Sequence, residues 1–279
     1  MTAYAYRIVN VFAEARLAGN PLAVFEDARG LDDATMQALA LQFNLSETTF
    51  VLPSSNATAH VRIFTPTFEM PFAGHPTLGT AHVVRALRGG DDDLVTLEMK
   101  AGVIPVHADG ERWTLSANAP RHHAAAASRA DLAAALGLAE GDLADPALWV
   151  DTGSEQLVIP LVSIDAVKRA APRADLMTKH ASNGQRSMAY VFARDGDHVV
   201  CRFFFPKHGA VIEDPGTGSA CANLGGWLLA TGAPLPQRLT LDQGAAVGRP
   251  CRLGLAVGAD RSIRVSGRVI ELGRGVVEL

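Results

Sequence analysis

Short apolar segments, separated by turn residues, recur along the whole chain. Most of them are rich in β-branched side chains or alternate apolar and polar positions, which is typical of strands that have one buried face. We expect strands at residues 7–12, 22–25, 48–52, 94–99, 103–107, 113–117, 156–161, 188–192, 239–241, 252–257 and 262–265.

Helical periodicity is confined to a few segments. Residues 32–43 place Met36, Leu39 and Phe43 three or four positions apart, and Asp32 suits the N-cap. A second helix is expected at residues 129–136. The runs 78–84 and 220–230 contain no charged residue, so each lacks a polar face and should be enclosed by strands. These patterns predict an α+β protein in which strands predominate.

One pattern occurs twice. Residues 62–66 read RIFTP, and residues 202–206, which lie 140 positions later, read RFFFP. Each segment is followed by an acidic residue (Glu69 or Glu213), a turn rich in Gly, Pro and Thr, and one of the uncharged helical runs. Two unrelated strand-to-helix turns are the alternative, but chance rarely repeats the whole order. We predict two similar halves, 1–118 and 119–279, with the last strand able to return to the first half and a linker at 118–128.

Composition narrows the class of protein. The 279 residues are 48% apolar and 19% charged, enough for one large domain or two ordinary ones. With 25 Lys and Arg against 29 Asp and Glu, the net charge is −4, and no basic run is present. Nucleic acid and anionic membranes are therefore disfavoured as partners. We expect a cytoplasmic protein, because no signal-peptide pattern begins the chain and the cysteines suggest a reducing environment.

Metal and membrane signals are weak. The 3 cysteines have no CxxC spacing, and no His and Asp spacing resembles a metal triad, so no metal site is expected. The uncharged run 215–237 is long enough to span a bilayer, yet it contains 5 glycines and 3 prolines. A soluble helix that is buried on all sides fits this run better.

The two Gly-rich turns carry the candidate chemistry. Each precedes a helix, and the free N–H groups at a helix start bind carboxylates. Taken alone, either turn is more simply a tight connection; at matching positions in two halves, they favour a binding site. The polar residues beside them suit proton transfer at a carbon next to a carboxylate, namely His75, Asp214, Thr217 and Ser219. Each of these also has a plain structural explanation, as a buried histidine, an N-cap or a helix-start hydroxyl.

Glu47 is a further candidate. It stands between the helix expected at 32–43 and the strand expected at 48–52, with apolar residues just beyond it. If its side chain is half-buried, desolvation would raise its pKa towards neutrality and make it a usable general acid and base. A surface glutamate that closes a turn is the alternative.

Taken together, the motifs resemble the PhzF-like family of phenazine biosynthesis isomerase-like proteins, which has the diaminopimelate epimerase-like fold. The likeness spans nearly the whole chain. Its most specific parts are the Gly74-His75-Pro76-Thr77 turn and the Asp214-Pro215 pair followed by Thr217-Gly218-Ser219. Shorter matches are Val11-Phe12, Gly19-Asn20-Pro21, Ser46-Glu47-Thr48, Phe64-Thr65-Pro66, Gln243-Gly244 and Gly248-Arg249-Pro250.

The resemblance implies two halves, each a strongly curved, mostly antiparallel sheet around one central helix, with the active site between them. It implies that Glu47 is the general acid and base that moves a proton between two carbons of a small carboxylate-bearing substrate. His75 and Asp214 match residues that orient or protonate the substrate. The substrate-binding positions would be Ser46, Gly74, Thr217, Gly218 and Ser219. The family uses no metal or organic cofactor, and its members are commonly homodimers.

Two other functions remain open at this point. Amino-acid racemases and epimerases of the same fold need a thiol on each side of the substrate, but Ala73 and Pro215 stand at those places. We expect Cys201, Cys221 and Cys251 to be small core residues instead. A non-catalytic metabolite-binding protein is the other alternative, and the complete set of polar residues at the turns argues against it.

Overall fold

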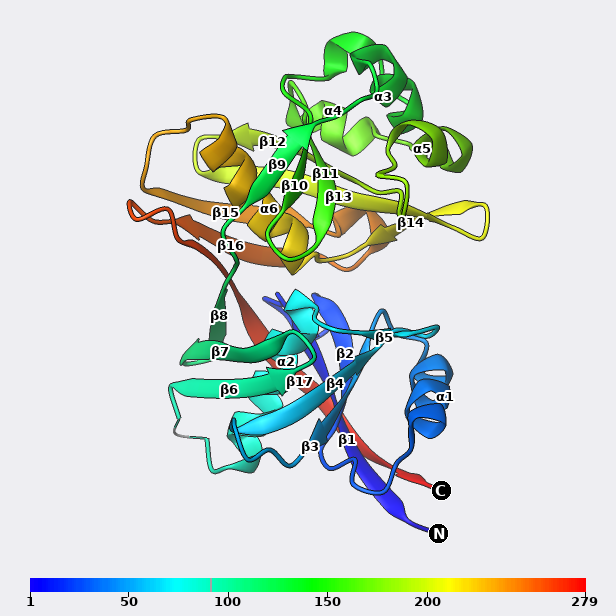
Figure 1. Cartoon of the computed structure of the whole chain (residues 1–279), viewed down its shortest axis with the longest axis vertical. Helices are drawn as coiled ribbons and strands as arrows, with labels where there is room; N and C mark the ends of the chain where they lie inside the picture. The colour runs from blue at the N-terminus through cyan, green and yellow to red at the C-terminus, as the bar shows by residue number, and fades with distance from the viewer. Residues whose placement is uncertain (91) are drawn as a thin grey trace. The chain divides into compact units, whose positions relative to one another are not determined.

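The protein, seen here as a computed structural model, is described over residues 1–90 and 92–279. It divides into two compact units, Met1–Ser116 with Ser266–Leu279, and Ala117–Val265. Strands predominate in both, and each unit holds one long helix among its strands (Figure 1), so the expected α+β class is confirmed. The expected halves were 1–118 and 119–279, with the last strand able to return to the first half. In the structure, residues 266–279 of the last strand belong to the first unit.

The first unit is built from the N-terminal part of the chain. Its elements are β1 (Ala3–Val11), β2 (Asn20–Phe25), α1 (Asp33–Phe43), β3 (Thr48–Leu52), β4 (Ala59–Phe64), β5 (Glu69–Met70), α2 (Gly74–Leu87), β6 (Leu94–Met99), β7 (Gly102–Asp109) and β8 (Arg112–Ser116). The last strand, β17 (Ile263–Glu278), begins in the second unit and continues in the first.

The second unit has the same core with more helices around it. Its elements are β9 (Arg121–Ala124), α3 (Arg129–Leu136), the 3-10 turn η1 (Glu140–Asp142), β10 (Leu148–Asp151), β11 (Glu155–Pro160), α4 (Ile164–Arg169), α5 (Ala174–His180), β12 (Ala189–Asp195), β13 (His198–Lys207), β14 (Ala210–Asp214), α6 (Gly218–Ala230), β15 (Gln237–Gln243), η2 (Ala245–Val247) and β16 (Cys251–Val257).

Strand pairing confirms the internal duplication. In the first unit β1/β2, β3/β4, β4/β5 and β6/β7 are antiparallel, whereas β2/β3 and β4/β6 are parallel. In the second unit β10/β11, β12/β13, β13/β14 and β15/β16 are antiparallel, whereas β11/β12 and β13/β15 are parallel. The long helix follows β5 in one unit and β14 in the other. Both units therefore have one and the same topology.

The repeated sequence pattern makes the same contacts in both units. Arg62 on β4 pairs with Glu69 at 2.7 Å and lies over the ring of Phe64. Arg202 on β13 pairs with Glu213 at 2.6 Å and lies over the ring of Phe204. The acidic residue after each RIFTP-like segment is thus the partner of the arginine that opens it.

The two long helices are enclosed as expected. Helix α2 contacts β1 to β4 and β6 to β8, and α6 contacts β9, β10, β11 and β16. Glycines allow the close approach: a Cβ at Gly79 would lie 2.6 Å from Leu22 Cδ2, and one at Gly226 would lie 2.7 Å from Val150 Cγ1. In the described part of the chain, no helix has both the length and the apolar character needed to cross a membrane.

Several segments differ from the sequence-based expectations. The predicted linker 118–128 contains β9, whose exposed residues RHHA pair antiparallel with β10 and carry no apolar signal. Helices α4 and α5 were not expected, because each is under two turns long and shows too little periodicity. Strand β17 extends far beyond the expected segment 262–265. The extension was not predicted, because Gly273 and Gly275 interrupt its alternation of apolar and polar residues.

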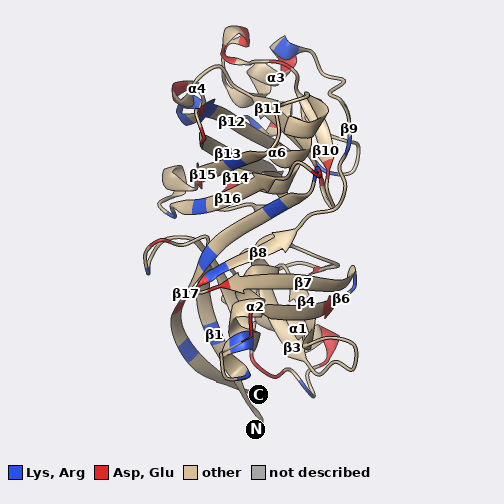
Figure 2. Ribbon diagram, turned by 90° about the vertical axis from the view of Figure 1, so that its left-hand side faces the viewer, with Lys and Arg blue, Asp and Glu red and all other residues tan. Residues whose placement is uncertain are grey.

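The extension of β17 closes the first unit. It pairs with β1 from Ala3↔Glu278 to Val11↔Val269, and the backbone of Thr2 exchanges hydrogen bonds with that of Leu279. Basic residues recur along this strand (Figure 2), and within the first unit Arg268 pairs with Glu111 and Arg274 with Glu271. Ladder hydrogen bonds, rather than a hydrophobic stripe, therefore account for its length.

Arg202 supports a stability prediction, because it holds more than its ion pair. Its guanidinium also donates to the carbonyls of Val167 and Ala170 at the end of α4, where the last carbonyls of a helix lack i+4 partners. Replacing it (Arg202→Met) leaves Glu213, whose side chain is only 7% exposed, without its cation. We expect the free energy of unfolding to fall by about 3 kcal/mol, measured by chemical denaturation.

The matched control is Arg29→Met, which breaks the pair of Arg29 and Asp27 at the surface. This change should leave the denaturation midpoint unmoved. An equal loss for both variants would contradict the assignment of a structural role to Arg202.

Candidate active site

Glu47 lies at the junction of α1 and β3. Helix α1 ends because Asn44 adopts a left-handed conformation (φ 50°) and its N–H donates to the carbonyl of Ala40. Strand β3 begins at Thr48, the residue after Glu47, and Thr48 is paired with β2 on one side and β4 on the other. The backbone beside Glu47 is therefore fixed within the sheet, and its side chain is only 16% exposed.

His75 stands in the first turn of α2, directly after the buried Gly74. Its side chain is 6% exposed, and Nδ1 lies 3.3 Å from Oε2 of Glu47. Nδ1 also lies 3.5 Å from Nδ2 of Asn20, which precedes Pro21 in β2. Burial lowers the pKa of His75 to about 3, although a hydrogen bond to the backbone of Pro21 acts in the opposite direction. The imidazole is therefore neutral near pH 7, and its contact with Glu47 is a polar contact rather than an ion pair.

Asp214 ends β14 and opens the second Gly-rich turn. Its carboxylate accepts a hydrogen bond from the hydroxyl of Thr217. Gln243, at the end of β15, donates from Nε2 to the carbonyl of Asp214 at 2.9 Å and to Oγ1 of Thr217 at 3.0 Å. Its Oε1 accepts from the N–H of Thr217 at 3.3 Å. One buried amide therefore holds both ends of the Asp214 turn.

The backbone at position 244 requires the glycine that follows Gln243. Its φ of +80° is left-handed, and a Cβ there would lie 2.4 Å from the carbonyl oxygen of Pro215 and 2.3 Å from that of Arg249. No larger residue fits such close backbone contacts. The pair Gln243-Gly244, which the sequence marked without a role, packs directly against the Asp214 turn.

Neither long helix has a side-chain cap at its start. Ala73 at the N-cap of α2 has only a methyl group, and the hydroxyl of Thr217 at the N-cap of α6 is bound to Asp214. The first N–H groups of a helix have no partner within the helix and carry partial positive charge. Both helix starts therefore keep their capacity to bind a carboxylate.

The remaining predicted residues lie beside these groups. Gly74, Thr217 and Gly218 are buried, Ser219 is half-buried, and Ser46, which precedes Glu47, is exposed. Within the first unit the structure brings Glu47 and His75 together. Within the second it brings Asp214 and Thr217 together, and Oγ of Ser219 accepts from Nε2 of Gln156 at 2.9 Å.

Three polar residues beside the predicted site residues were not themselves predicted as site candidates. They are Asn20 beside His75, Gln156 beside Ser219, and Asn223, which donates to Gln156. Asn223 had a detectable signal, because it is the one amide side chain in helix α6, whose other residues beyond Ser219 are apolar. Gln156 similarly stands in a strand whose next residues are all apolar.

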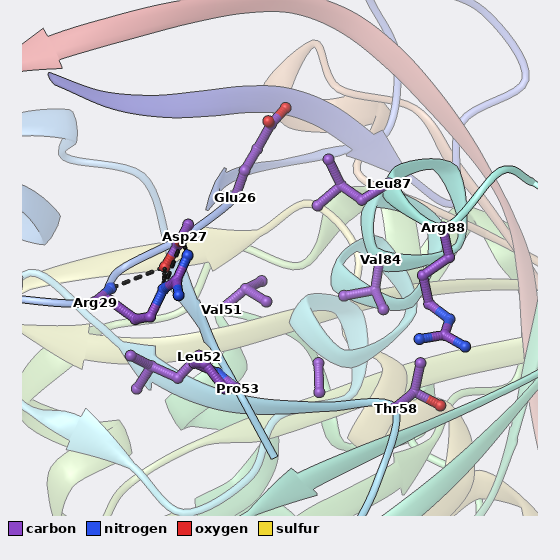
Figure 3. A pocket seen from close by; sticks show the side chains of 11 residues that line it. Glu26, Asp27, Arg29, Val51, Leu52, Pro53, Thr58, Val84, Leu87 and Arg88 are labelled. Carbon is purple, nitrogen blue, oxygen red and sulfur yellow. Dashed lines mark hydrogen bonds and ion pairs between the residues drawn. The ribbon is translucent and has the colours of Figure 1, made fainter. Parts of the chain in front are cut away.

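A separate pocket of about 310 Å³ lies in the first unit (Figure 3). It is lined by Val51, Leu52, Val84 and Leu87 together with charged residues, and none of the predicted site residues lines it. Asp27 and Arg29 at its edge pair with each other, and Arg88 pairs with Asp92. Its charges are thus already satisfied, and we assign it no chemistry.

The cysteines have the core positions expected of them. All three are buried, and burial raises the pKa of Cys201 to about 12 and that of Cys221 well above its usual value. They are therefore uncharged thiols near pH 7. Across residues 1–90 and 92–279, no cluster of three or more His, Cys, Asp or Glu is arranged to hold a metal ion.

Comparison with known proteins gives full-length matches. A family model described as phenazine biosynthesis-like protein (PhzC-PhzF) matches residues 9–275. An uncharacterized isomerase of Pasteurella multocida is 41% identical, over 99% of this chain and 94% of its own. A trans-2,3-dihydro-3-hydroxyanthranilate isomerase of Pseudomonas fluorescens is 36% identical, over 98% of this chain and 99% of its own.

Solved structures agree with these matches. A PhzF family protein from Bacillus anthracis superposes with a TM-score of 0.90 at 26% identity, over 100% of both chains. The fold reaches further, to a hydroxyproline epimerase from Agrobacterium vitis with a TM-score of 0.65 at 13% identity, over 99% of this chain and 91% of that one. That second likeness concerns the fold alone. On the full-length match to the family model and to its relatives, the chain belongs to the PhzF family of isomerases.

Proposed function

We propose that the protein moves a proton between two carbons of a small carboxylate-bearing substrate, with Glu47 as general acid and base. The observation that carries this proposal is the contact between Glu47 and His75, in which a largely buried carboxylate lies 3.3 Å from a neutral imidazole. A carboxylate in this setting is a base that can return the proton it has taken.

The proposed reaction needs no oxidant or reductant. Glu47 removes a proton from one carbon, and the electron pair of that C–H bond shifts into the neighbouring π-system. The same carboxyl group then gives the proton to another carbon, and a new C–H bond forms there. Low exposure of Glu47 favours this return, because little water competes for the proton.

The other predicted residues would bind the substrate and orient it. The uncapped starts of α2 and α6, with Ser46, Gly74, Gly218 and Ser219, would supply N–H and O–H donors for its carboxylate. Thr217, whose N–H and hydroxyl are bound to Gln243 and Asp214, would hold the second turn in place beside them. His75 and Asp214 would hydrogen-bond the enol or enolate as it forms. A neutral His75 suits this role, because an imidazolium would pair permanently with Glu47 and weaken it as a base.

We further propose that the substrate belongs to the class named for the Pseudomonas fluorescens relative, a cyclic amino acid with an unsaturated ring. Identity of 36% over nearly the whole of both chains supports this choice as the first compound to assay. Racemisation by two thiols receives no support, because burial keeps Cys201 and Cys221 protonated.

Loss of the Glu47 carboxylate gives the central test. Glu47→Gln keeps the shape of the side chain but cannot take up a proton, so turnover of trans-2,3-dihydro-3-hydroxyanthranilate should fall by about a thousandfold or more. Product formation is followed by NMR. The control Glu140→Gln changes an exposed glutamate and should keep wild-type turnover. Near-normal activity of Glu47→Gln would refute the assignment.

The neutral state of His75 predicts a pH dependence of stability. The pKa is about 3 in the folded chain, below the ordinary value of 6.5, so the unfolded chain binds the additional proton first. The contribution of the neutral His75 imidazole to the stability of the fold is therefore complete above pH 6.5, and it is lost as the pH falls towards 3. Between pH 6 and pH 5, the wild type should lose about 1 kcal/mol more unfolding free energy than His75→Asn.

Denaturant titrations of both proteins at several pH values measure this difference. His107→Asn, a change at an exposed histidine, is the control and should follow the wild type. Parallel curves for the wild type and His75→Asn would mean that His75 is not held neutral by the fold.

A further inference from the structure

Behind the first turn of α6 lies a chain of buried amides. Oδ1 of Asn223 accepts from the backbone N–H of Thr152 at 3.0 Å and from its hydroxyl at 2.7 Å. Nδ2 of Asn223 donates to the carbonyl of Ser154 and to Oε1 of Gln156, both at 2.8 Å. Nε2 of Gln156 then donates to Oγ of Ser219 at 2.9 Å. All of these residues belong to the second unit.

The direction of every hydrogen bond in this chain is determined by the backbone. The N–H of Thr152 can only donate, and the carbonyl of Ser154 can only accept, so the amide of Asn223 has a single orientation. Its Nδ2 therefore requires an acceptor, which is Oε1 of Gln156. Gln156 is left with its NH₂ group towards Ser219, and Oγ of Ser219 accepts there.

Burial makes this arrangement costly to disturb. Asn223 has no exposed surface, Gln156 is 4% exposed and Thr152 is 7% exposed. A reversed amide would bring two donors or two acceptors together away from water, which is expensive in free energy. The network therefore holds Ser219 in one hydrogen-bonding state.

We propose that Gln156 and Asn223 are positioning residues that make Ser219 a hydrogen-bond donor to the carboxylate of the substrate. With one lone pair occupied by Gln156, the hydroxyl proton of Ser219 is directed to the next partner. Such a hydroxyl prefers a group that only accepts, an ionised carboxylate, to a carboxamide, which also carries donors. This inference rests on the proposed function, since it assumes that Ser219 contacts substrate, and it adds how a carboxylate is selected.

Gln156→Glu tests the direction of the network. A carboxylate at this position still accepts from Asn223 but can also accept from Ser219, so it turns the hydroxyl proton away from the substrate. The probes are anthranilate and its neutral analogue anthranilamide, with Kd measured by titration calorimetry. We expect Kd for anthranilate to rise about tenfold or more and Kd for anthranilamide to change little.

The Ser219→Ala background separates this effect from charge repulsion. Without the hydroxyl, Gln156→Glu has no proton to turn, so its selective loss of anthranilate affinity should disappear. A loss of the same factor in that background, or an equal loss for both probes, would overturn the proposal. Gln185→Glu adds the same charge at an exposed position of the second unit and should leave both Kd values unchanged.

A second variant covers a failure of Gln156→Glu to fold. Gln156→Met removes the donor to Ser219 but adds no charge, while Nδ2 of Asn223 keeps its bond to Ser154. It should weaken anthranilate binding severalfold, and again only when Ser219 is present. Because all these readouts are binding constants, they stand apart from turnover. Retained activity in Glu47→Gln would refute the proposed acid and base, whereas unchanged binding in the Gln156 variants would refute the positioning role.

Discussion

Enclosure of two helices that have no polar face is the constraint on which this structure depends. Most residues of helices α2 and α6 are buried, so strands must surround each helix. Small residues such as Gly79 and Gly226 let the strands come close enough to exclude water. Polar chemistry is then concentrated at the helix starts, where the backbone offers unpaired N–H groups. His75, Thr217 and Ser219 all occupy such positions.

The two units use one topology for different polar groups. In the first, the turn before the helix is accompanied by a carboxylate and a neutral imidazole, Glu47 and His75. In the second, amides replace them: Gln243 secures the Asp214 turn, and Gln156 with Asn223 secures Ser219. The pairs Arg62–Glu69 and Arg202–Glu213 have stayed the same in both units. Shared scaffold contacts have thus been kept while the groups beside the helix starts diverged.

Much of this organisation could be predicted from the sequence, for identifiable reasons. Helix α3 and strand β3 were predicted with their observed bounds, because each has a clear local pattern of apolar residues. The duplication was predictable because the arginine, proline and glutamate of each repeat recur in order. Strand β9 was missed, since four exposed residues held by backbone hydrogen bonds leave no apolar pattern. The motifs identified Glu47 and His75 as candidates but could not show that their side chains lie 3.3 Å apart. That proximity depends on the pairing of β2 with β3, which connects residues distant in the sequence.

The path of β17 has a consequence for how this chain matures during synthesis. Strand β1 is synthesised long before β17, its partner along Ala3–Val11. Until β17 has been synthesised, β1 keeps an unpaired edge, which is a template for intermolecular pairing. The second unit, by contrast, has nearly all of its strands before residue 258. The first unit is therefore completed after the second, and a nascent chain that stalls before β17 carries the exposed edge of β1.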